Sequence, residues 1–367
     1  MAQDIVNENQ KISYTNLDFS AIYTETINLI KQLTYKWDPS ISNESDPGVV
    51  LVKLSALLAD KMNYNIDKNI LETFPLSVTQ DGNARQLYDQ LGYYMDWYVS
   101  GAAPIALNWT GDTVTETDTQ GNITTVTYKI PKFTTIIDSE QSVSKRYSLI
   151  GIEGAEDNIV SDILLTTDGK TVIALALEGL AVQYQYEGET VITSQMVDPL
   201  SRRLYFTTSN ISQNGVFIKN TNQENYASWK RVNNLYENSF DELRYVFGYD
   251  SNTNTCFLEF PDNYTELFGS GIEITYLLID PTAGDVPAGD LSQFMSPVTI
   301  TNADGKTIVT LGSENVKLSN YLASTGHKDV ESINEAYINY KKTVGTFKTL
   351  ITLRDYANYI RNQDLAL

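Results

Sequence analysis

The residues from Asp250 to Asn254 place oxygen-bearing side chains at alternate positions, the spacing with which an EF-hand loop begins to hold Ca²⁺. Such a loop needs glycine next and glutamate at its end, where this chain has Thr255 and Pro261. We therefore predict a hairpin turn. Asp280 and Asp285 could also share a cation, but no further oxygen ligands lie nearby in the sequence. We predict a turn there as well, and neither a metal nor another cofactor.

The chain has one cysteine, Cys256, and one histidine, His327. These numbers exclude an internal disulfide and a zinc site built from cysteine and histidine, and fit folding in a reducing cytosol. A nucleophilic pair would need both residues to be adjacent in space, and neither sits in a recognisable motif. We predict a buried strand cysteine and a histidine in a loop or at a helix start. No catalytic set is legible, so we expect a protein that is not an enzyme.

Carbohydrate chemistry is the alternative that the residues leave open. Trp97, Trp109 and Trp229 lie in or beside a β-rich region and could stack on sugars if exposed, although a buried core position is the simpler interpretation. A glycosidase needs two carboxylates at a set separation, and 46 acidic residues without a local motif nominate no pair.

The formal net charge of −20 argues against nucleic-acid binding, which requires clustered Lys and Arg. It fits either plain solubility or a field that steers the chain toward basic partner surfaces. The polar N-terminus, residues 1–10, does not resemble a signal peptide, and no apolar run approaches the length of a membrane span. We expect no membrane insertion.

Residues 1–100 are predicted to be helical. Asp18 is a helix cap, and apolar residues follow it at helical spacing as far as Trp37. Asp46 and Pro47 favour the start of a long helix, and no proline interrupts Val49 to Phe74. A third helix is expected from Asn83 to Leu91, ending at Gly92.

The first half of the long helix is apolar on every side, so it should be buried on every side. With one other strong helix nearby, we expect other subunits to cover it, and the same residues to be exposed or disordered in isolation. Packing against the β region of the same chain is the rival. The residues predicted to form this protein interface are Val49, Val52, Leu54, Leu57, Leu58 and Met62.

Residues 101–320 are rich in β-forming residues with turn signals between short runs, which predicts two antiparallel β subdomains, sandwich- or barrel-like. Hairpin turns are expected at Asp168-Gly169, Asn214-Gly215 and Asp304-Gly305, with a looser turn at Gln120-Gly121-Asn122. Residues 321–367 form a short α/β segment, with a helix from about Asp329 that Asp329 or Ser324 would cap, an extended run and a second helix. The fold class is α+β, multidomain.

Five segments in order together resemble the baseplate J-like family of contractile phage tails and related injection systems. The segments are Asp46-Pro47-Gly48 through Asn63-Tyr64, Ala84-Arg85 through Pro104, Tyr128 through Thr134, Trp229 through Gly289, and Ser324 through Ile333 with Leu353 to Tyr356 beyond. The chain departs from the family pattern at Phe260-Pro261-Asp262-Asn263 and at Gly326-His327. Members also usually continue well past the last segment, so we expect either a short form or a sequence that stops early.

The resemblance implies a structural, non-enzymatic wedge protein of the baseplate, made and assembled in the host cytoplasm and located in the virion tail. It implies that residues 1–100 join wedge proteins and that residues 321–367 begin a ring-contact domain. The implied partners are a second copy of the chain, other wedge proteins, a sheath-initiator or lysozyme-like baseplate protein, and neighbours of the hub. The alternative is a carbohydrate-binding or carbohydrate-cleaving tail protein that uses the β region.

Overall fold

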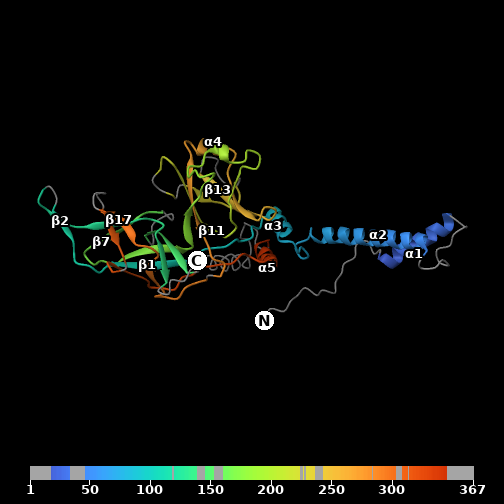
Figure 1. Ribbon diagram of the computed structural model, residues 1–367, viewed down its shortest axis with the longest axis horizontal. Helices are drawn as coiled ribbons and strands as arrows, with labels where there is room; N and C mark the ends of the chain where they lie inside the picture. The colour runs from blue at the N-terminus through green and yellow to red at the C-terminus, as the bar shows by residue number, and fades with distance from the viewer. Residues whose placement is uncertain are drawn as a thin grey trace, which may run out of the picture. The chain divides into compact units, whose positions relative to one another are not determined.

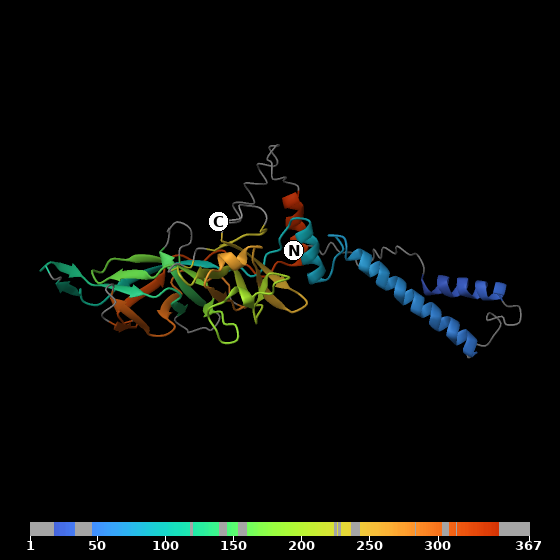
Figure 2. The same ribbon diagram turned by 90° about the horizontal axis from the view of Figure 1, so that it is seen from above.

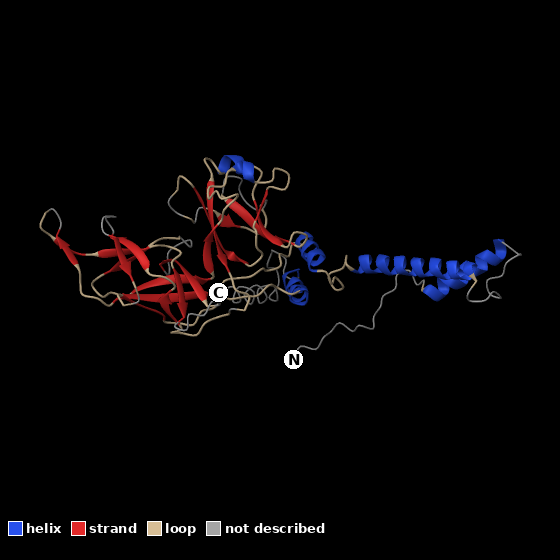
Figure 3. Ribbon diagram, viewed as in Figure 1, coloured by secondary structure: helices blue, strands red, loops and turns tan. Residues whose placement is uncertain are grey.

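The computed structural model describes residues 18–33, 46–117, 120–138, 145–152, 160–223, 226, 229–235, 243–282, 284–302, 308–312 and 314–344. The chain divides into two compact units, Met1–Tyr93 (unit 1) and Tyr94–Leu367 (unit 2). Unit 1 is helical and unit 2 consists mostly of strands (Figures 1 and 3). The predicted α+β, multidomain class is confirmed.

Unit 1 contains α1 (Phe19–Leu33), α2 (Pro47–Leu71) and α3 (Asp81–Gln90). The predicted caps are present: Asp18 Oδ1 accepts from the Ala21 amide at 2.8 Å, and Asp46 Oδ1 accepts from the Gly48 amide at 2.7 Å. Figure 2 shows α1 beside α2, and the two helices contact each other. The long helix ends three residues earlier than predicted and α3 begins two residues earlier. Trp37 lies outside the described residues.

The turn from α2 to α3 is built around one buried carboxylate. Glu72 accepts hydrogen bonds from the Thr79 amide at 3.2 Å, the Gln80 amide at 3.2 Å and the Asn83 side-chain amide at 3.2 Å. The two backbone donors are the residues immediately before α3, and the third is a side chain in its first turn. Glu72 therefore ties the end of α2 to the segment that leads into α3.

The first β subdomain of unit 2 combines a six-stranded sheet, in the order β16-β5-β6-β8-β1-β19, with a four-stranded sheet, β18-β17-β4-β7. The edge strands β16 and β19 also contact each other, so the larger sheet is nearly a closed barrel. One core fills both sheets, with Ile105, Leu107, Ile130 and Leu149 fully buried. The strands are β1 (Ala102–Trp109), β4 (Thr127–Ile130), β5 (Thr135–Asp138), β6 (Arg146–Ile152), β7 (Ile163–Thr166), β8 (Val172–Glu178), β16 (Leu291–Phe294), β17 (Val298–Asn302), β18 (Ile308–Leu311) and β19 (Val316–Asn320).

The second β subdomain is inserted between β8 and β16. It pairs a three-stranded sheet, β11-β15-β9, with a four-stranded sheet, β10-β14-β13-β12, over a separate core that includes Ile218, Leu258 and Phe260. Its elements are β9 (Leu180–Gln183), β10 (Arg203–Tyr205), β11 (Ile211–Asn220), β12 (Lys230–Arg231), β13 (Arg244–Asp250), β14 (Thr255–Glu259), α4 (Tyr264–Leu267) and β15 (Ile272–Leu278). The chain therefore passes from one subdomain to the other at Glu178 and returns after Leu278.

Two of the predicted hairpins are present and two are wrong. The turn at residues 120–122 joins the small strands β2 (Thr115–Thr117) and β3 (Ile123–Thr125), and β17 pairs with β18, although residues 303–307 lie outside the described part. Asp168-Gly169 instead connects two different sheets, because β7 pairs with β4 while β8 pairs with β1 and β6. Asn214-Gly215 lies inside β11, where the register with β15 shifts.

The C-terminal part of the described chain is α5 (Ile333–Val344), which confirms the predicted helix, although it begins four residues after Asp329. The predicted cap at Asp329 or Ser324 is wrong, because the Ser332 hydroxyl accepts from the Glu335 amide at 3.3 Å. The extended run and the second helix predicted after it fall on residues 345–367, outside the described residues.

Candidate functional site

One side of α2 is covered by its own chain. Val49, Val52 and Ala56 recur at helical spacing and are 2%, 9% and 1% exposed, and α1 is the helix that contacts α2. Val49 and Val52 therefore differ from our expectation for the isolated chain, because a neighbouring part of the same unit buries them. The sequence could not separate them from the other apolar residues, since the helix is apolar on both sides.

The other side of α2 carries an exposed apolar stripe, called here the α2 stripe. It consists of Val50, Leu51, Leu54, Leu57, Leu58 and Met62, which are between 49% and 65% exposed. At about 100° per residue these six side chains are centred on the side of the helix opposite the line of Val49, Val52 and Ala56. From Val50 to Met62 the stripe is about 18 Å long at about 1.5 Å per residue. Beyond it the sequence turns polar, beginning with Asn63.

The α2 stripe supplies apolar area and no catalytic groups. Complete burial of an exposed leucine contributes about 1.5–3 kcal/mol, so half-exposed side chains contribute about 1 kcal/mol each on docking. Exposed apolar surface that is contiguous marks an interaction site more often than scattered single residues do. What the stripe can do chemically is pack against another apolar helix or sheet face.

The candidate cation loops are turns, as predicted. Residues 250–255 close the β13–β14 hairpin, in which Asp250 Oδ1 accepts from the Asn252 amide at 2.9 Å. Asp280 Oδ1 accepts from the Thr282 amide at 2.9 Å and hydroxyl at 2.7 Å, and these bonds lower the pKa of Asp280. Within the described ranges, no three His, Cys, Asp or Glu side chains are grouped so that they could hold a metal ion.

The single cysteine and the three tryptophans belong to the core. Cys256 is fully buried in β14, and Trp97, Trp109 and Trp229 are 8%, 8% and 5% exposed. The core interpretation of these residues is confirmed, and they offer no flat exposed ring on which a sugar could stack.

Sequence reasoning missed a buried polar cluster around Glu178, the last residue of β8. Its Oε2 atom accepts from the Gly101 amide at 3.0 Å and lies 2.7 Å from Nδ1 of His327. Glu178 is 1% exposed, and burial raises its pKa against the lowering effect of these two hydrogen bonds. The partners are 77 and 149 residues away in sequence, so no local pattern could have brought them together.

A second group of polar side chains adjoins the first. Ser324 Oγ accepts from the Tyr147 hydroxyl at 2.9 Å and from the Val286 amide at 2.7 Å, and lies 3.2 Å from Asp285 Oδ1. Burial raises the pKa of the Tyr147 phenol well above its ordinary value. A side-chain methyl on Gly101 would come within 2.9 Å of Asp285 Oδ1, so these segments pack without spare room.

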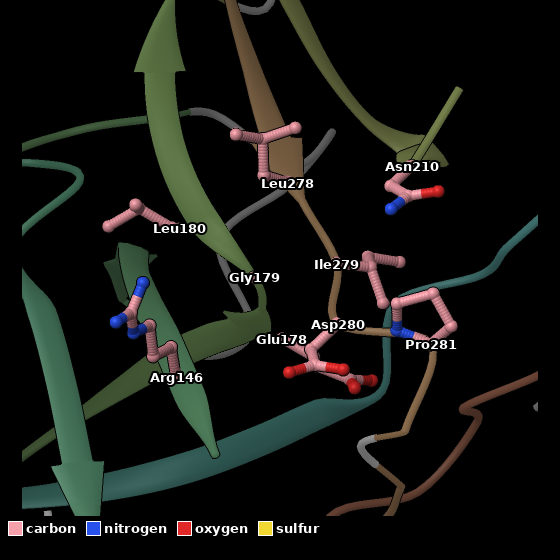
Figure 4. A pocket seen from close by; sticks show the side chains of 9 residues that line it. All are labelled: Arg146, Glu178, Gly179, Leu180, Asn210, Leu278, Ile279, Asp280 and Pro281. Atoms are coloured by element: carbon pink, nitrogen blue, oxygen red, sulfur yellow. The ribbon is translucent and has the colours of Figure 1, made fainter. Parts of the chain in front are cut away.

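An open cleft of about 340 Å³ lies where the two β subdomains meet. Arg146, Glu178 and Asp280 supply its charge, and Leu180, Leu278 and Ile279 are among its apolar lining. In Figure 4 the guanidinium of Arg146 points away from the two carboxylates. The lining combines residues of the first subdomain, such as Arg146, with residues of the inserted one, such as Leu278, so the cleft marks the junction between the subdomains.

Among the helices that the structure describes, none combines the length and the apolar character needed to cross a bilayer.

Comparison with solved structures gives distant matches. No family model matches the sequence, and no curated protein matches it. A chain in the six-fold symmetrised cryo-EM structure of the anti-feeding prophage (AFP) baseplate matches with 11% identity over 91% of this chain and 53% of that chain. This chain therefore spans about half the length of that neighbour. The TM-score of 0.29 is too low to establish a common fold.

Proposed function

We propose that this protein is a structural, non-enzymatic component of a contractile tail baseplate, acting in the wedge. The observation that carries the proposal is the α2 stripe: six exposed apolar side chains on the helix that begins with the Asp46-Pro47-Gly48 motif. That motif and the four later segments give the family resemblance. Exposure of the stripe supplies a physical reason for the chain to be assembled with others.

The energetics favour assembly among several subunits over a tight pair. Two copies docking through the stripe would gain about 12 kcal/mol at about 1 kcal/mol for each side chain. Association costs an estimated 4–15 kcal/mol before any affinity results. The stripe alone therefore supports a weak complex, and stable incorporation needs contacts from further chains. The proposed partners are a second copy of this chain, other wedge proteins, a sheath-initiator or lysozyme-like baseplate protein, and hub neighbours.

The proposed location is the tail baseplate of the virion, with synthesis and assembly in the host cytoplasm. Electron microscopy of assembled particles that carry a tag inserted at the exposed turn of residues 168–170 tests this proposal. Tag density at the baseplate around the hub supports it. Tag density on the tail tube, the fibres or the capsid, or its absence from purified particles, refutes it.

The carbohydrate alternative loses the feature that favoured it, because the three tryptophans of the β region are buried. Glycan-array binding by the purified chain would restore the alternative.

A further inference from the structure

Residues 94–101 are the first segment of unit 2, called here the entry segment, and two other segments hold it from the side. Toward β11, the Ser100 amide donates to Asn214 Oδ1 at 2.8 Å. Toward the connection between β19 and α5, the Val99 amide donates to the Lys328 carbonyl at 2.9 Å and the Lys328 amide donates back at 3.1 Å. The entry segment therefore lies between the inserted subdomain and residues 324–328.

Glu178 joins these parts at one point. Its carboxylate accepts from the Gly101 amide at 3.0 Å and meets the His327 ring at 2.7 Å, while its carbonyl accepts from the Ser100 hydroxyl at 2.6 Å. The end of β8, the end of the entry segment and residues 324–328 thus share a single ionisable group. The His327 side chain is 11% exposed, so both members of the pair are largely removed from water.

The second carboxylate oxygen of Glu178, Oε1, is buried without a hydrogen bond from the described part of the chain, so the carboxylate depends on the charge of His327. Oε1 has less than 1 Å² of accessible area and no hydrogen-bond partner among the described residues. A ligand from solvent cannot reach it, although the cleft lies next to the residue. A buried carboxylate without compensation is costly, whereas the same carboxylate beside a cation is tolerated.

Among the described residues, no other group near Glu178 takes the place of the imidazole as a positive charge hydrogen-bonded to its carboxylate. Burial is the main cause of the raised pKa of Glu178, and the negative charge of Asp285 raises it further. The Tyr147 hydroxyl also interacts electrostatically with Glu178. Arg146 and Asp280 line the cleft beside it without a hydrogen bond to its carboxylate among the described contacts.

A second carboxylate faces the imidazole, whereas the charged groups of the entry segment belong to other pairs. On the far side of the His327 ring, Asp329 lies 3.6 Å from Nε2 and is 73% exposed. Lys328 lies 3.6 Å from Asp96 of the entry segment, and Asp96 also interacts electrostatically with Arg231. The Asp96 amide donates to Glu331 at 2.9 Å.

We propose that His327 and Glu178 form a proton-dependent clamp on the entry segment, closed while the imidazole is positively charged and loosened when it becomes neutral. The cation balances the buried carboxylate, and a neutral ring leaves that charge next to Asp285 with a hydrogen bond alone. Histidine is the side chain whose charge ordinarily changes between about pH 5 and 8, so the clamp is tested across that range. The device concerns unit 2 alone and is independent of the proposed assembly role.

Amide hydrogen exchange of the full chain tests the clamp. We compare the amides of Val99 and Lys328 with those of Phe217 and Thr275, which face each other in the β11–β15 ladder, after correction for the chemical effect of pH on exchange. Between about pH 5 and 8, protection of the clamp amides should fall relative to that of the ladder amides, because loss of the imidazole charge leaves a buried carboxylate without a cation. Parallel behaviour of the two sets in the wild-type chain overturns the proposal.

Two variants separate a proton switch from a merely structural contact. Glu178→Gln keeps hydrogen-bonding atoms and removes the charge, and His327→Gln removes the titrating ring. Each should abolish the pH dependence of clamp protection, whereas Asp168→Asn on an exposed turn should leave it unchanged. Retention of the wild-type pH dependence in Glu178→Gln refutes the clamp. If a variant does not fold, the comparison within the wild-type chain still decides.

Discussion

Glu72 accepts a hydrogen bond from the side-chain amide of Asn83 at 3.2 Å, across the turn that joins α2 to α3. Burial raises the pKa of Glu72, but the bonds from Thr79, Gln80 and Asn83 outweigh it and hold the pKa below its ordinary value. A depressed pKa in the folded state means that the ionised form stabilises the turn. This stability is present above the unfolded-state pKa and is lost as the pH falls through the folded-state value.

Replacement of Glu72 by alanine should therefore open the turn. Hydrogen bonds to charged groups contribute about 1.5–3 kcal/mol, so we expect exchange of the Thr79 and Gln80 amides to accelerate at least tenfold in Glu72→Ala at neutral pH. The difference from wild type should shrink in acid below the ordinary glutamate pKa. Glu25→Ala, on the exposed surface of α1, is the control and should leave both amides unchanged. Equal exchange in Glu72→Ala and wild type would show that the carboxylate does not hold the turn.

Much of the architecture follows from local sequence signals. Asp18 and Asp46 mark helix starts because their side chains can satisfy the first free backbone amides. Alternation of buried residues along β1 identifies a strand with one face in the core. The insertion of one β subdomain into another has no such signal, since the pairing of β1 with both β8 and β19 joins residues far apart in sequence.

The α2 stripe and the Glu178–His327 pair differ in how far the sequence alone predicts them. The α2 stripe follows from composition, because a helix apolar on both sides exceeds what one neighbouring helix can cover. Which side α1 covers depends on packing, and so Val49 and Leu54 could not be told apart. The Glu178–His327 pair could not be predicted at all, because a lone acid and a lone histidine acquire meaning only when the fold brings them together.

The glycine of the Asn214-Gly215 pair, which lies inside β11 and not in a hairpin turn, is required by close packing against the neighbouring strand. A Cβ atom on Gly215 would lie 2.8 Å from the Cβ of Leu277 in the neighbouring strand, and that atom cannot swing away. Gly215→Ala should therefore lower the free energy of unfolding of unit 2 by about 1–3 kcal/mol through overpacking. Urea denaturation followed by tryptophan fluorescence measures this loss. Gly284→Ala, where no atom lies within 4 Å of the added carbon, is the control and should be neutral.

Phe133 adopts a φ of 63°, a left-handed conformation that costs a bulky residue about 1–2 kcal/mol. Its ring offsets this cost by packing 5.4 Å from Phe217 and 5.2 Å from Tyr226, measured between ring centres. Phe133→Gly should relieve the strain and lose the packing, for a net loss of about 1–2 kcal/mol, since Phe133 is partly buried and its removal costs less than the roughly 3–5 kcal/mol of a fully buried phenylalanine. Glu187→Gly, at an exposed residue with a φ of 50°, removes strain alone and should not destabilise unit 2. A Phe133→Gly chain as stable as wild type would show that the ring contributes little.

The α2 stripe should govern association without governing folding. Leu54 and Leu58 are 51% and 57% exposed, so the double change to aspartate costs the isolated unit little, whereas a charge in a buried interface is expensive. We expect wild-type chain to show self-association that rises with concentration in sedimentation velocity, and Leu54→Asp with Leu58→Asp to remain monomeric with an unchanged circular dichroism spectrum. Leu200→Asp is the matched control, because Leu200 is 94% exposed and belongs to unit 2. If the double variant associates like wild type, or if Leu200→Asp abolishes association equally, the stripe is not the contact surface.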